Sequence, residues 1–215
     1  MPVNKETYHQ IKTRLDSAGI TLVAVSKTKP QQDILELYEM GHRDFGENYV
    51  QELVDKQAAL PADIRWHFIG HLQSNKVKYI APFVHLIHGV DSASLLKEIN
   101  KQAVKNNRVI DCLLQVHIAK EETKFGLDEK ELEQISTGAD FPDVRIRGLM
   151  GMASFSDDTD LIRQEFNTLK NLHTRFTAFY PNFDILSMGM SSDYAIAMEE
   201  GSTMVRIGSL LFGAR

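Results

Sequence analysis

Apolar positions along the chain recur at two spacings, and stretches with one spacing alternate with stretches with the other. Between residues 4 and 18, Tyr8, Ile11 and Leu15 lie three and four residues apart, the spacing of one buried helix face. Residues 21–27 follow as a short run rich in apolar and β-branched side chains, which is typical of a buried strand. The same alternation of helix and strand continues to the end of the chain.

This alternation predicts eight strands, each followed by a helix or a helical turn. Parallel strands need crossover connections, so eight such units favour a (β/α)8 TIM barrel with residues 4–18 as an extra N-terminal helix. An open doubly wound sheet is the alternative, although its Gly-x-Gly-x-x-Gly sequence is absent after the first strand. The strands are expected at 21–27, 43–46, 65–69, 84–90, 109–118, 144–150, 183–187 and 203–207. Helices are expected at 4–18, 30–41, 48–60, 74–80, 91–106 and 159–179, with one after Asp128, a short one from Ser191 or Ser192, and a last turn ending at Arg215.

The length of the chain fits one barrel with its leading helix and no second domain. The chain has 215 residues, which gives each of the eight units about 27 residues, near the lower end for this fold. One barrel with its leading helix uses that length, so a single domain over residues 1–215 is predicted. Hydrophobic residues make up 43% and charged residues 25% of the chain, which is ordinary for a globular domain.

Charge and composition exclude several classes of protein. The net charge is −5 and there is no run of Lys or Arg, which argues against a nucleic-acid partner. The apolar runs are shorter than the roughly 20 residues of a membrane helix, and the first residues have no apolar signal segment. The single cysteine, Cys112, is expected to be a buried apolar side chain and fits a reducing, cytoplasmic setting. A monomer is expected.

Lys27 is the first candidate for chemistry, because barrel active sites lie at the C-terminal ends of the strands. Strand side chains alternate, so Lys27 shares one face with Val23 and Val25 and continues an apolar row to the barrel mouth. Partial desolvation there favours the free amine, which forms Schiff bases with carbonyl compounds. The alternative is an ordinary solvated lysine just beyond a strand.

A phosphate site is predicted after the last two strands. Ser191 and Ser192 follow the seventh strand, and Gly208 and Ser209 follow the eighth. Many barrels bind phosphate with these two loops and the N-terminus of a short helix. The alternative is that Ser191 or Ser192 only caps a helix.

Arg206 is expected to point into the barrel, because its neighbours Val205 and Ile207 would face the outer helices. A permanent charge there needs a partner, either a ligand phosphate, carboxylate or ring nitrogen, or an internal acid. The histidine pairs His67/His71 and His85/His88 do not have the spacing of a zinc site, so no metal is predicted.

A lysine at the mouth, a phosphate site and an inward arginine together suggest pyridoxal phosphate (PLP), the vitamin B6 cofactor. The sequence resembles the pyridoxal phosphate homeostasis protein family, single-domain relatives of the alanine racemase barrel. The resemblance spans nearly the whole chain and is carried by residues 25–30, 45–52, 66–76, 148–150, 189–193, 201–208 and 212–215.

The resemblance implies a fold and a set of roles. The fold is the alanine-racemase-like barrel, known as fold type III among PLP proteins. Lys27 resembles the lysine that holds the cofactor as an internal aldimine, and Arg206 resembles the residue that faces the pyridine nitrogen. The phosphate contacts would be Ser191, Ser192, Gly208 and Ser209, and the pocket wall would include Asn48 and Met150.

The function expected from this resemblance is non-enzymatic: the protein would buffer PLP or deliver it to PLP-dependent apo-enzymes. An arginine at the ring nitrogen disfavours protonation of the ring, which weakens carbanion chemistry. The related two-domain racemases complete their site with a second domain, for which the residues after Ile207 leave no room. Two alternatives stay open: a small PLP-dependent amino-acid racemase, and a barrel that binds another phosphorylated metabolite.

Overall fold

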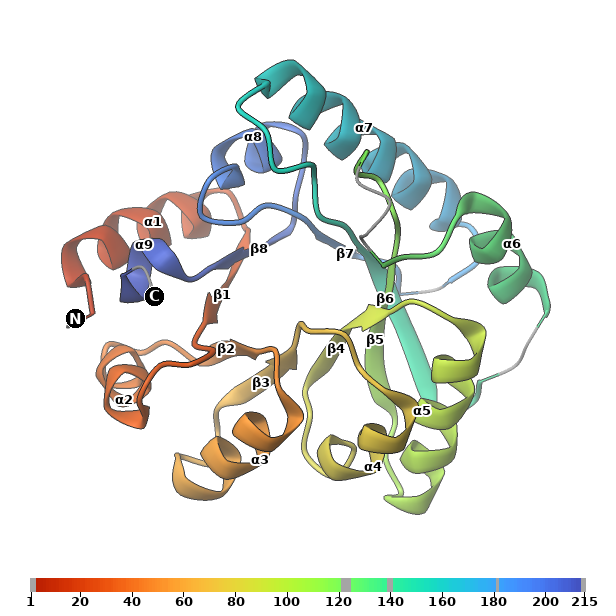
Figure 1. Cartoon of the computed structure of the whole chain (residues 1–215), viewed down its shortest axis with the longest axis horizontal. Helices are drawn as coiled ribbons and strands as arrows, with labels where there is room; N and C mark the ends of the chain where they lie inside the picture. Colours follow the sequence, from red (N-terminus) through yellow and green to blue (C-terminus); the bar gives the residue numbers. More distant parts are fainter. Residues whose placement is uncertain (1–2, 121–124, 139–140, 181, 214–215) are drawn as a thin grey trace.

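Eight parallel strands close into a barrel in the computed structural model, which describes residues 3–120, 125–138, 141–180 and 182–213 (Figure 1). Each strand pairs with the next along the chain, and β1 also pairs with β8, which excludes the open sheet. The predicted (β/α)8 barrel is therefore confirmed. The strands are β1 (Thr21–Val25), β2 (Asp44–Glu47), β3 (Arg65–Phe68), β4 (Leu86–Val90), β5 (Ile110–Gln115), β6 (Val144–Met150), β7 (Ile185–Ser187) and β8 (Met204–Ile207).

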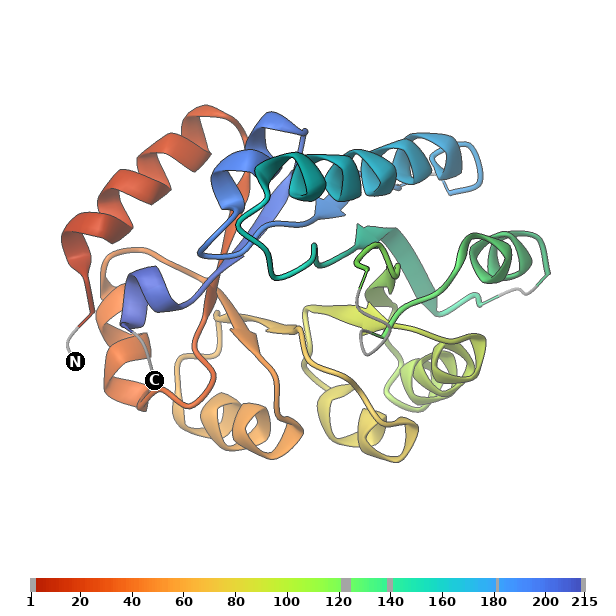
Figure 2. The same cartoon turned by 45° about the horizontal axis from the view of Figure 1, so that its top comes forward.

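The helices form a ring outside the strands, as Figures 1 and 2 show. They are α1 (Lys5–Ser17), α2 (Gln31–Glu39), α3 (Val50–Ala59), a 3-10 turn η1 (Ser74–Lys76) continued by α4 (Val77–Ile80), α5 (Ala93–Lys105), α6 (Glu129–Gly138), α7 (Thr159–Phe176), α8 (Tyr194–Glu199) and α9 (Ser209–Phe212). The expected N-terminal helix is α1, which lies beside α9, and the backbone N–H of Asn4 donates to the carbonyl of Leu211 at 2.8 Å. None of the described helices is long and apolar enough to cross a bilayer.

Several element ends differ from the prediction by a few residues. Strand β1 stops at Val25, so Lys27 lies just beyond the strand and not in its last position. Helix α8 begins at Tyr194, because residues 190–193 form a turn in which the Met190 N–H donates to the Asp193 carboxylate at 2.6 Å. The predicted last turn ends at Phe212 among the described residues, and Ala214 and Arg215 lie outside them.

Apolar packing occurs in two separate places. The larger cluster fills the space between the strands and the helices, where side chains such as Phe45 and Phe68 are fully buried. A smaller cluster lies inside the barrel and consists of Val23, Leu86, Leu113, Met150 and Met204. Inward and outward side chains alternate along each strand, which sends neighbouring residues into different clusters.

Candidate functional site

A cavity of about 510 Å³ opens at the C-terminal ends of the strands. Its place agrees with the position of active sites in this fold, and its size suits a small organic ligand. The predicted residues that line it are Lys27, Asn48, Ser191, Ser192, Arg206, Gly208 and Ser209; Val25, Ile69, Met152, Phe155 and Leu210 add apolar wall.

Met150, which was expected in the pocket wall, is not among the residues that line this cavity. Strand pairing sets Met150 level with Ser187, and Ser187 level with Met204, which is two residues before Arg206. Met150 is buried in the apolar cluster inside the barrel. Met152, two residues further along, lines the cavity instead.

Lys27 is positioned by its two neighbours, which are both tied to α3. The Ser26 hydroxyl donates to the Glu47 carboxylate at 2.6 Å, and the Ser26 carbonyl accepts from Lys56 Nζ at 2.8 Å. On the other side, the Thr28 N–H donates to Glu52 at 2.6 Å. Thr28 adopts a positive φ of 62°, a conformation that a β-branched residue rarely takes without such support. The backbone therefore holds Lys27 at the mouth from both sides.

The cluster that supports Lys27 is itself a buried ion network. Lys56 Nζ contacts Glu47 and Glu52, each at 2.7 Å, and both Glu47 and Lys56 are buried. Burial raises the pKa of the Glu47 carboxyl, although Lys56 and the Ser26 hydroxyl oppose that effect. Sequence reasoning missed this network. Glu52 and Lys56 lie four residues apart on a helix that follows Glu47, a spacing at which such side chains meet.

The two serine loops meet at the cavity. The Gly208 N–H donates to Ser191 Oγ at 3.3 Å, which links the loop after β7 to the loop after β8. Gly208 precedes α9 and Ser209 is its first residue. Ser191 and Ser192 lie in the turn before α8, whose N-cap residue is Asp193, so neither serine has the helix-capping role considered as the alternative. The arrangement offers hydroxyl groups and backbone N–H groups to an anion from two loops.

Arg206 points into the barrel as predicted, and Val205 and Ile207 pack in the outer cluster. Its guanidinium donates to Ser187 Oγ at 2.6 Å and to the Gly151 carbonyl at 3.0 Å. Burial lowers the pKa of Arg206 to about 10, so the side chain stays charged at neutral pH. Among the described residues no carboxylate lies within salt-bridge distance of it, but the buried Asp193 carboxylate acts on it electrostatically and favours its charge against the effect of burial. A ligand atom that accepts a hydrogen bond would suit this charge.

A cluster of Asp44, His67 and His85 lies at the opposite, N-terminal end of the barrel. One possible ligand atom from each lies within 4.8 Å of the others. The Asp44 carboxylate already pairs with both Arg65 Nε and Nη2, at 2.7 and 2.6 Å. Because Arg65 neutralises that carboxylate and would repel a cation, we assign no metal to this cluster.

Residues 5–215 match the protein family described as alanine racemase, N-terminal domain. The pyridoxal phosphate homeostasis protein of Aquifex aeolicus (strain VF5) is 43% identical over 198 residues, which cover 90% of this chain and 86% of that protein. The pyridoxal phosphate homeostasis protein of Escherichia coli (strain K12) is 40% identical over 204 residues, which cover 91% of this chain and 86% of that protein.

Two solved structures illustrate the range of the likeness. PipY of Synechococcus elongatus PCC7942, solved with PLP bound, superposes with a TM-score of 0.86 at 35% identity, covering 97% of this chain and 99% of that one. The alanine racemase of Bartonella henselae, with covalently bound pyridoxal phosphate, superposes with a TM-score of 0.73 at 17% identity. That match covers 97% of this chain and 59% of the racemase, so the likeness is one of fold.

Proposed function

This chain belongs to the pyridoxal phosphate homeostasis protein family, and from that premise we propose that its C-terminal cavity binds PLP and holds it for buffering or delivery. The observation that carries the proposal is the convergence of Lys27, Arg206 and the two serine loops on one cavity. These groups suit the aldehyde, the ring nitrogen and the phosphate of one small molecule. Another phosphorylated metabolite could use a lysine at that place only as a charge, whereas the aldehyde of PLP can also bond to it covalently.

Lys27 would hold the cofactor covalently. Its amine, once neutral, would condense with the aldehyde of PLP to a carbon–nitrogen double bond with loss of one water. The reaction needs no oxidant or reductant and reverses when water attacks the same carbon. Reversibility is what a carrier requires, because the cofactor must be released intact.

The remaining polar groups orient the cofactor. Ser191, Ser192, Gly208 and Ser209 would donate hydrogen bonds to the phosphate from two loops that already contact each other. Arg206 would donate to the pyridine nitrogen and leave it unprotonated. An unprotonated ring is a weak electron sink, so the cofactor would be held without activating an amino acid.

The side chains of the cavity favour a carrier over a racemase. Racemisation removes a proton from one face of the substrate and returns one to the other, which needs two proton-transferring groups. Among the described residues that line the cavity, the titratable side chains are Lys27, Lys29 and Arg206. Lys29 Nζ is engaged by the carbonyls of Phe212 and Gly213 at 2.8 and 3.1 Å. Arg206 stays protonated, which leaves Lys27 without a second base.

The test is the visible absorption band that a lysine–PLP Schiff base produces. The purified protein is mixed with PLP, and the band is measured for the wild type, for Lys27→Ala and for Lys97→Ala, an exposed lysine of α5 away from the cavity. We expect the band in the wild type and in Lys97→Ala, and its loss in Lys27→Ala. A wild-type protein without the band, or a Lys27→Ala variant that keeps it, would refute the proposal.

A second measurement separates carrier from racemase. Single-enantiomer amino acids are incubated with the PLP-loaded protein and followed by chiral chromatography. We expect no racemisation beyond that of free PLP at the same concentration. Sustained racemisation that disappears in Lys27→Ala would show that the protein is an enzyme.

We further propose that this single barrel works as a cytoplasmic monomer and supplies PLP to apo-enzymes. Mixing the loaded protein with a PLP-dependent apo-enzyme tests delivery. Activation faster than that by the same concentration of free PLP indicates direct transfer, and activation at the rate set by released PLP indicates buffering.

A further inference from the structure

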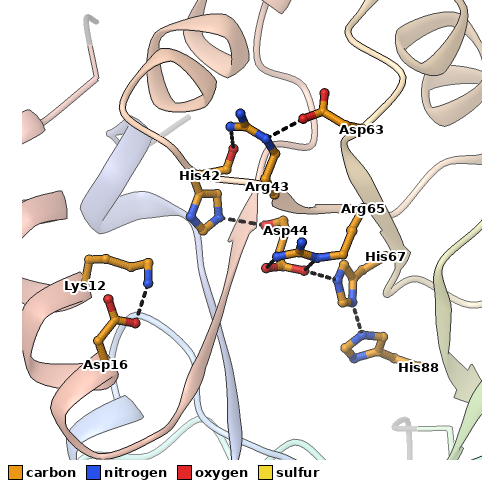
Figure 3. A network of polar contacts seen from close by, with 9 residues as sticks. All are labelled: Lys12, Asp16, His42, Arg43, Asp44, Asp63, Arg65, His67 and His88. Atoms are coloured by element: carbon orange, nitrogen blue, oxygen red, sulfur yellow. Dashed lines mark hydrogen bonds and ion pairs between the residues drawn. The ribbon is translucent and has the colours of Figure 1, made fainter.

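A row of polar side chains crosses the inside of the barrel and ends at Arg206. Asp44 Oδ1 lies 3.1 Å from His67 Nε2, and His67 Nδ1 lies 3.0 Å from His88 Nε2. Figure 3 draws both contacts as dashed lines. His88 Nδ1 lies 3.2 Å from Ser187 Oγ, which lies 2.6 Å from Arg206 Nη1. The contacts thus run without a break from the N-terminal end of the barrel to the cavity at its other end.

The row is shut away from solvent along most of its length. His88 and Ser187 are fully buried, His67 is 1% exposed and Arg206 is 4% exposed. Beside them inside the barrel lies the apolar cluster that contains Met150. Because bulk water does not reach these groups, each must find its donor or acceptor in its neighbours. The proton positions are then fixed by the two ends of the row.

The two ends impose one direction on the hydrogen bonds. The Arg206 guanidinium only donates, so Ser187 Oγ accepts from it and can give its own proton to His88 Nδ1. His88 then carries its proton on Nε2 and donates to His67 Nδ1. His67 in turn carries its proton on Nε2 and donates to the Asp44 carboxylate, which only accepts. Every hydrogen in this arrangement has an acceptor.

We propose that Asp44, His67, His88 and Ser187 are positioning residues that form one oriented hydrogen-bond chain and hold the Arg206 guanidinium as a donor toward the PLP ring nitrogen. This inference rests on the proposed function only for its last link, the ring nitrogen. The hydrogen-bond chain itself is present in the protein without cofactor.

The charges around the chain agree with this direction. Burial lowers the pKa of His88 well below its ordinary value, with the nearby His67 and Arg206 adding to the effect, so His88 is neutral at neutral pH. Burial opposes the charge of the Asp44 carboxyl, but hydrogen bonds from Arg65 and His67 outweigh it and lower its pKa, so the acceptor end stays ionised. His85, whose ring contacts His67, has its pKa lowered by burial.

The opposite direction leaves groups unmatched. If neutral His88 carried its proton on Nδ1, Ser187 Oγ would accept from both His88 and Arg206, and its own hydrogen would lose its acceptor in the row. His67 would then have to donate from Nδ1 to His88, and with that as its one ring proton its Nε2 would be bare. An unprotonated Nε2 would face the Asp44 carboxylate at 3.1 Å, and two acceptors at that distance repel each other.

The direction of the hydrogen-bond chain is tested first in the wild-type protein without PLP. Long-range proton–nitrogen NMR correlations of the imidazole rings report which nitrogen carries the proton. We expect the Nε2 atoms of His67 and His88, and not their Nδ1 atoms, to carry the ring protons at neutral pH. A proton on Nδ1 of either ring, or a doubly protonated His67, would overturn the proposal. This result does not depend on whether the protein binds PLP.

The link to the cofactor is tested with Ser187→Ala, which removes the contact between Arg206 and His88. The matched control is Ser202→Ala, which removes another buried hydroxyl, one bonded to the carbonyls of Leu186, Met188 and Met204 and outside the row. We expect Ser187→Ala to weaken PLP affinity about tenfold and to shift the His88 Nδ1 resonance, while Lys27 still forms its Schiff base.

Ser202→Ala is expected to keep the wild-type PLP affinity and His88 resonance even if it unfolds more easily. Equal PLP affinities for the two variants would mean that the row is only structural and would overturn the positioning role. Failure of the wild type to bind PLP would instead refute the proposed function and leave the NMR result standing.

Discussion

His42 illustrates how much one buried side chain can contribute to the pH dependence of folding. Its ring packs edge-on against Tyr8 and Phe45, and its Nε2–H donates to the Asp44 carbonyl at 2.8 Å. Burial lowers the pKa of His42 from 6.5 to about 4. Between these two pH values the unfolded chain binds a proton that the folded protein does not. Stability therefore falls as the pH falls through this range.

We expect His42→Leu to remove this part of the pH dependence. When the pH falls from about 7.5 to 5, the titration of His42 lowers the free energy of unfolding of the wild type by about 2 kcal/mol. In the variant, the free energy of unfolding should fall by about 2 kcal/mol less over the same pH range, even if the variant is less stable at both pH values. Urea unfolding at the two pH values measures it, with His9→Leu, an exposed histidine of α1, as the control. Identical losses in the wild type and in His42→Leu would contradict the assignment.

Strand alternation was enough to predict that Arg206 points into the barrel, and it led to Lys27 at the mouth even though β1 ends two residues earlier, at Val25. It depends only on the period of two in the sequence, and both residues extend a pattern that is easy to see. It was not enough for Met150, because the depth of an inward residue depends on how far each strand is shifted against its neighbours. A register shift between Cys112 and Leu113, opposite Gly148, interrupts the alternation shortly before Met150. Gly148 inside the strand is the one local signal of such a shift, because an isolated glycine in a strand often marks a bulge.

Helix α3 acts as a clamp on the loop that carries Lys27. Lys56 and Glu52 of α3 bind the backbone on both sides of Lys27, and Glu47 at the end of β2 accepts from the Ser26 hydroxyl and from Lys56. Removing one partner of a buried ion pair leaves the other charge uncompensated in a place that water does not reach. The clamp is therefore important both for folding and for the place of the reactive amine.

We expect Lys56→Met to lower the free energy of unfolding by about 3–5 kcal/mol, because it leaves Glu47 buried without its cation. Lys101→Met is the control, because the Lys101 side chain is 60% exposed and its pair with Glu98 lies at the surface. Its effect should be within about 0.5 kcal/mol. Urea denaturation at neutral pH gives both values. A loss below about 1 kcal/mol in Lys56→Met would show that the network contributes little.

The sequence predicted which helices and strands exist better than the residues at which they begin and end. The helix expected after Asp128 is α6, and its start is a capping box in which the Glu131 and Asp128 side chains each accept from the other residue's backbone N–H, at 2.9 and 2.8 Å. The start of α8 was placed too early, because Ser191 and Ser192 are good capping residues by type. The Asp193 side chain instead closes a turn with the N–H of Met190, and the helix follows that turn.

For the molecule as a whole, a ligand that binds only the folded barrel must stabilise it. PLP at about one hundred times its dissociation constant should add about 2.7 kcal/mol to the free energy of unfolding. For a chain of this size that corresponds to a rise in Tm of roughly 5–11 °C. Thermal unfolding followed by circular dichroism, with and without PLP, measures the shift.

Two controls make that measurement specific. Lys27→Ala should show a smaller rise in Tm at the same PLP concentration, because it lacks the covalent bond. Pyridoxine, which has neither the aldehyde nor the phosphate, should give almost no rise. An equal rise with pyridoxine would mean that the ring alone accounts for binding, and the roles given to Lys27 and the serine loops would be wrong.

The barrel could be predicted from the sequence because it follows from counting alternating units, which needs no knowledge of contacts between distant residues. The hydrogen-bond chain from Asp44 to Arg206 could not be predicted in that way. Its members come from β2, β3, β4, β7 and β8, and they meet only after the sheet has closed with one particular stagger of its strands. The sequence shows the histidine pairs His67/His71 and His85/His88. Only the fold shows that His67 of the first pair and His88 of the second share a hydrogen bond.

The two separate apolar clusters have a consequence for how this protein can change. The larger one lies in the shell between strands and helices, and the inner one is small and shares the lumen with polar side chains. Substitutions at inward positions therefore disturb a minor part of the apolar packing. The outer cluster stabilises the fold. The side chains inside the barrel can therefore be replaced, in evolution or by design, with a different row of functional groups while the protein still folds.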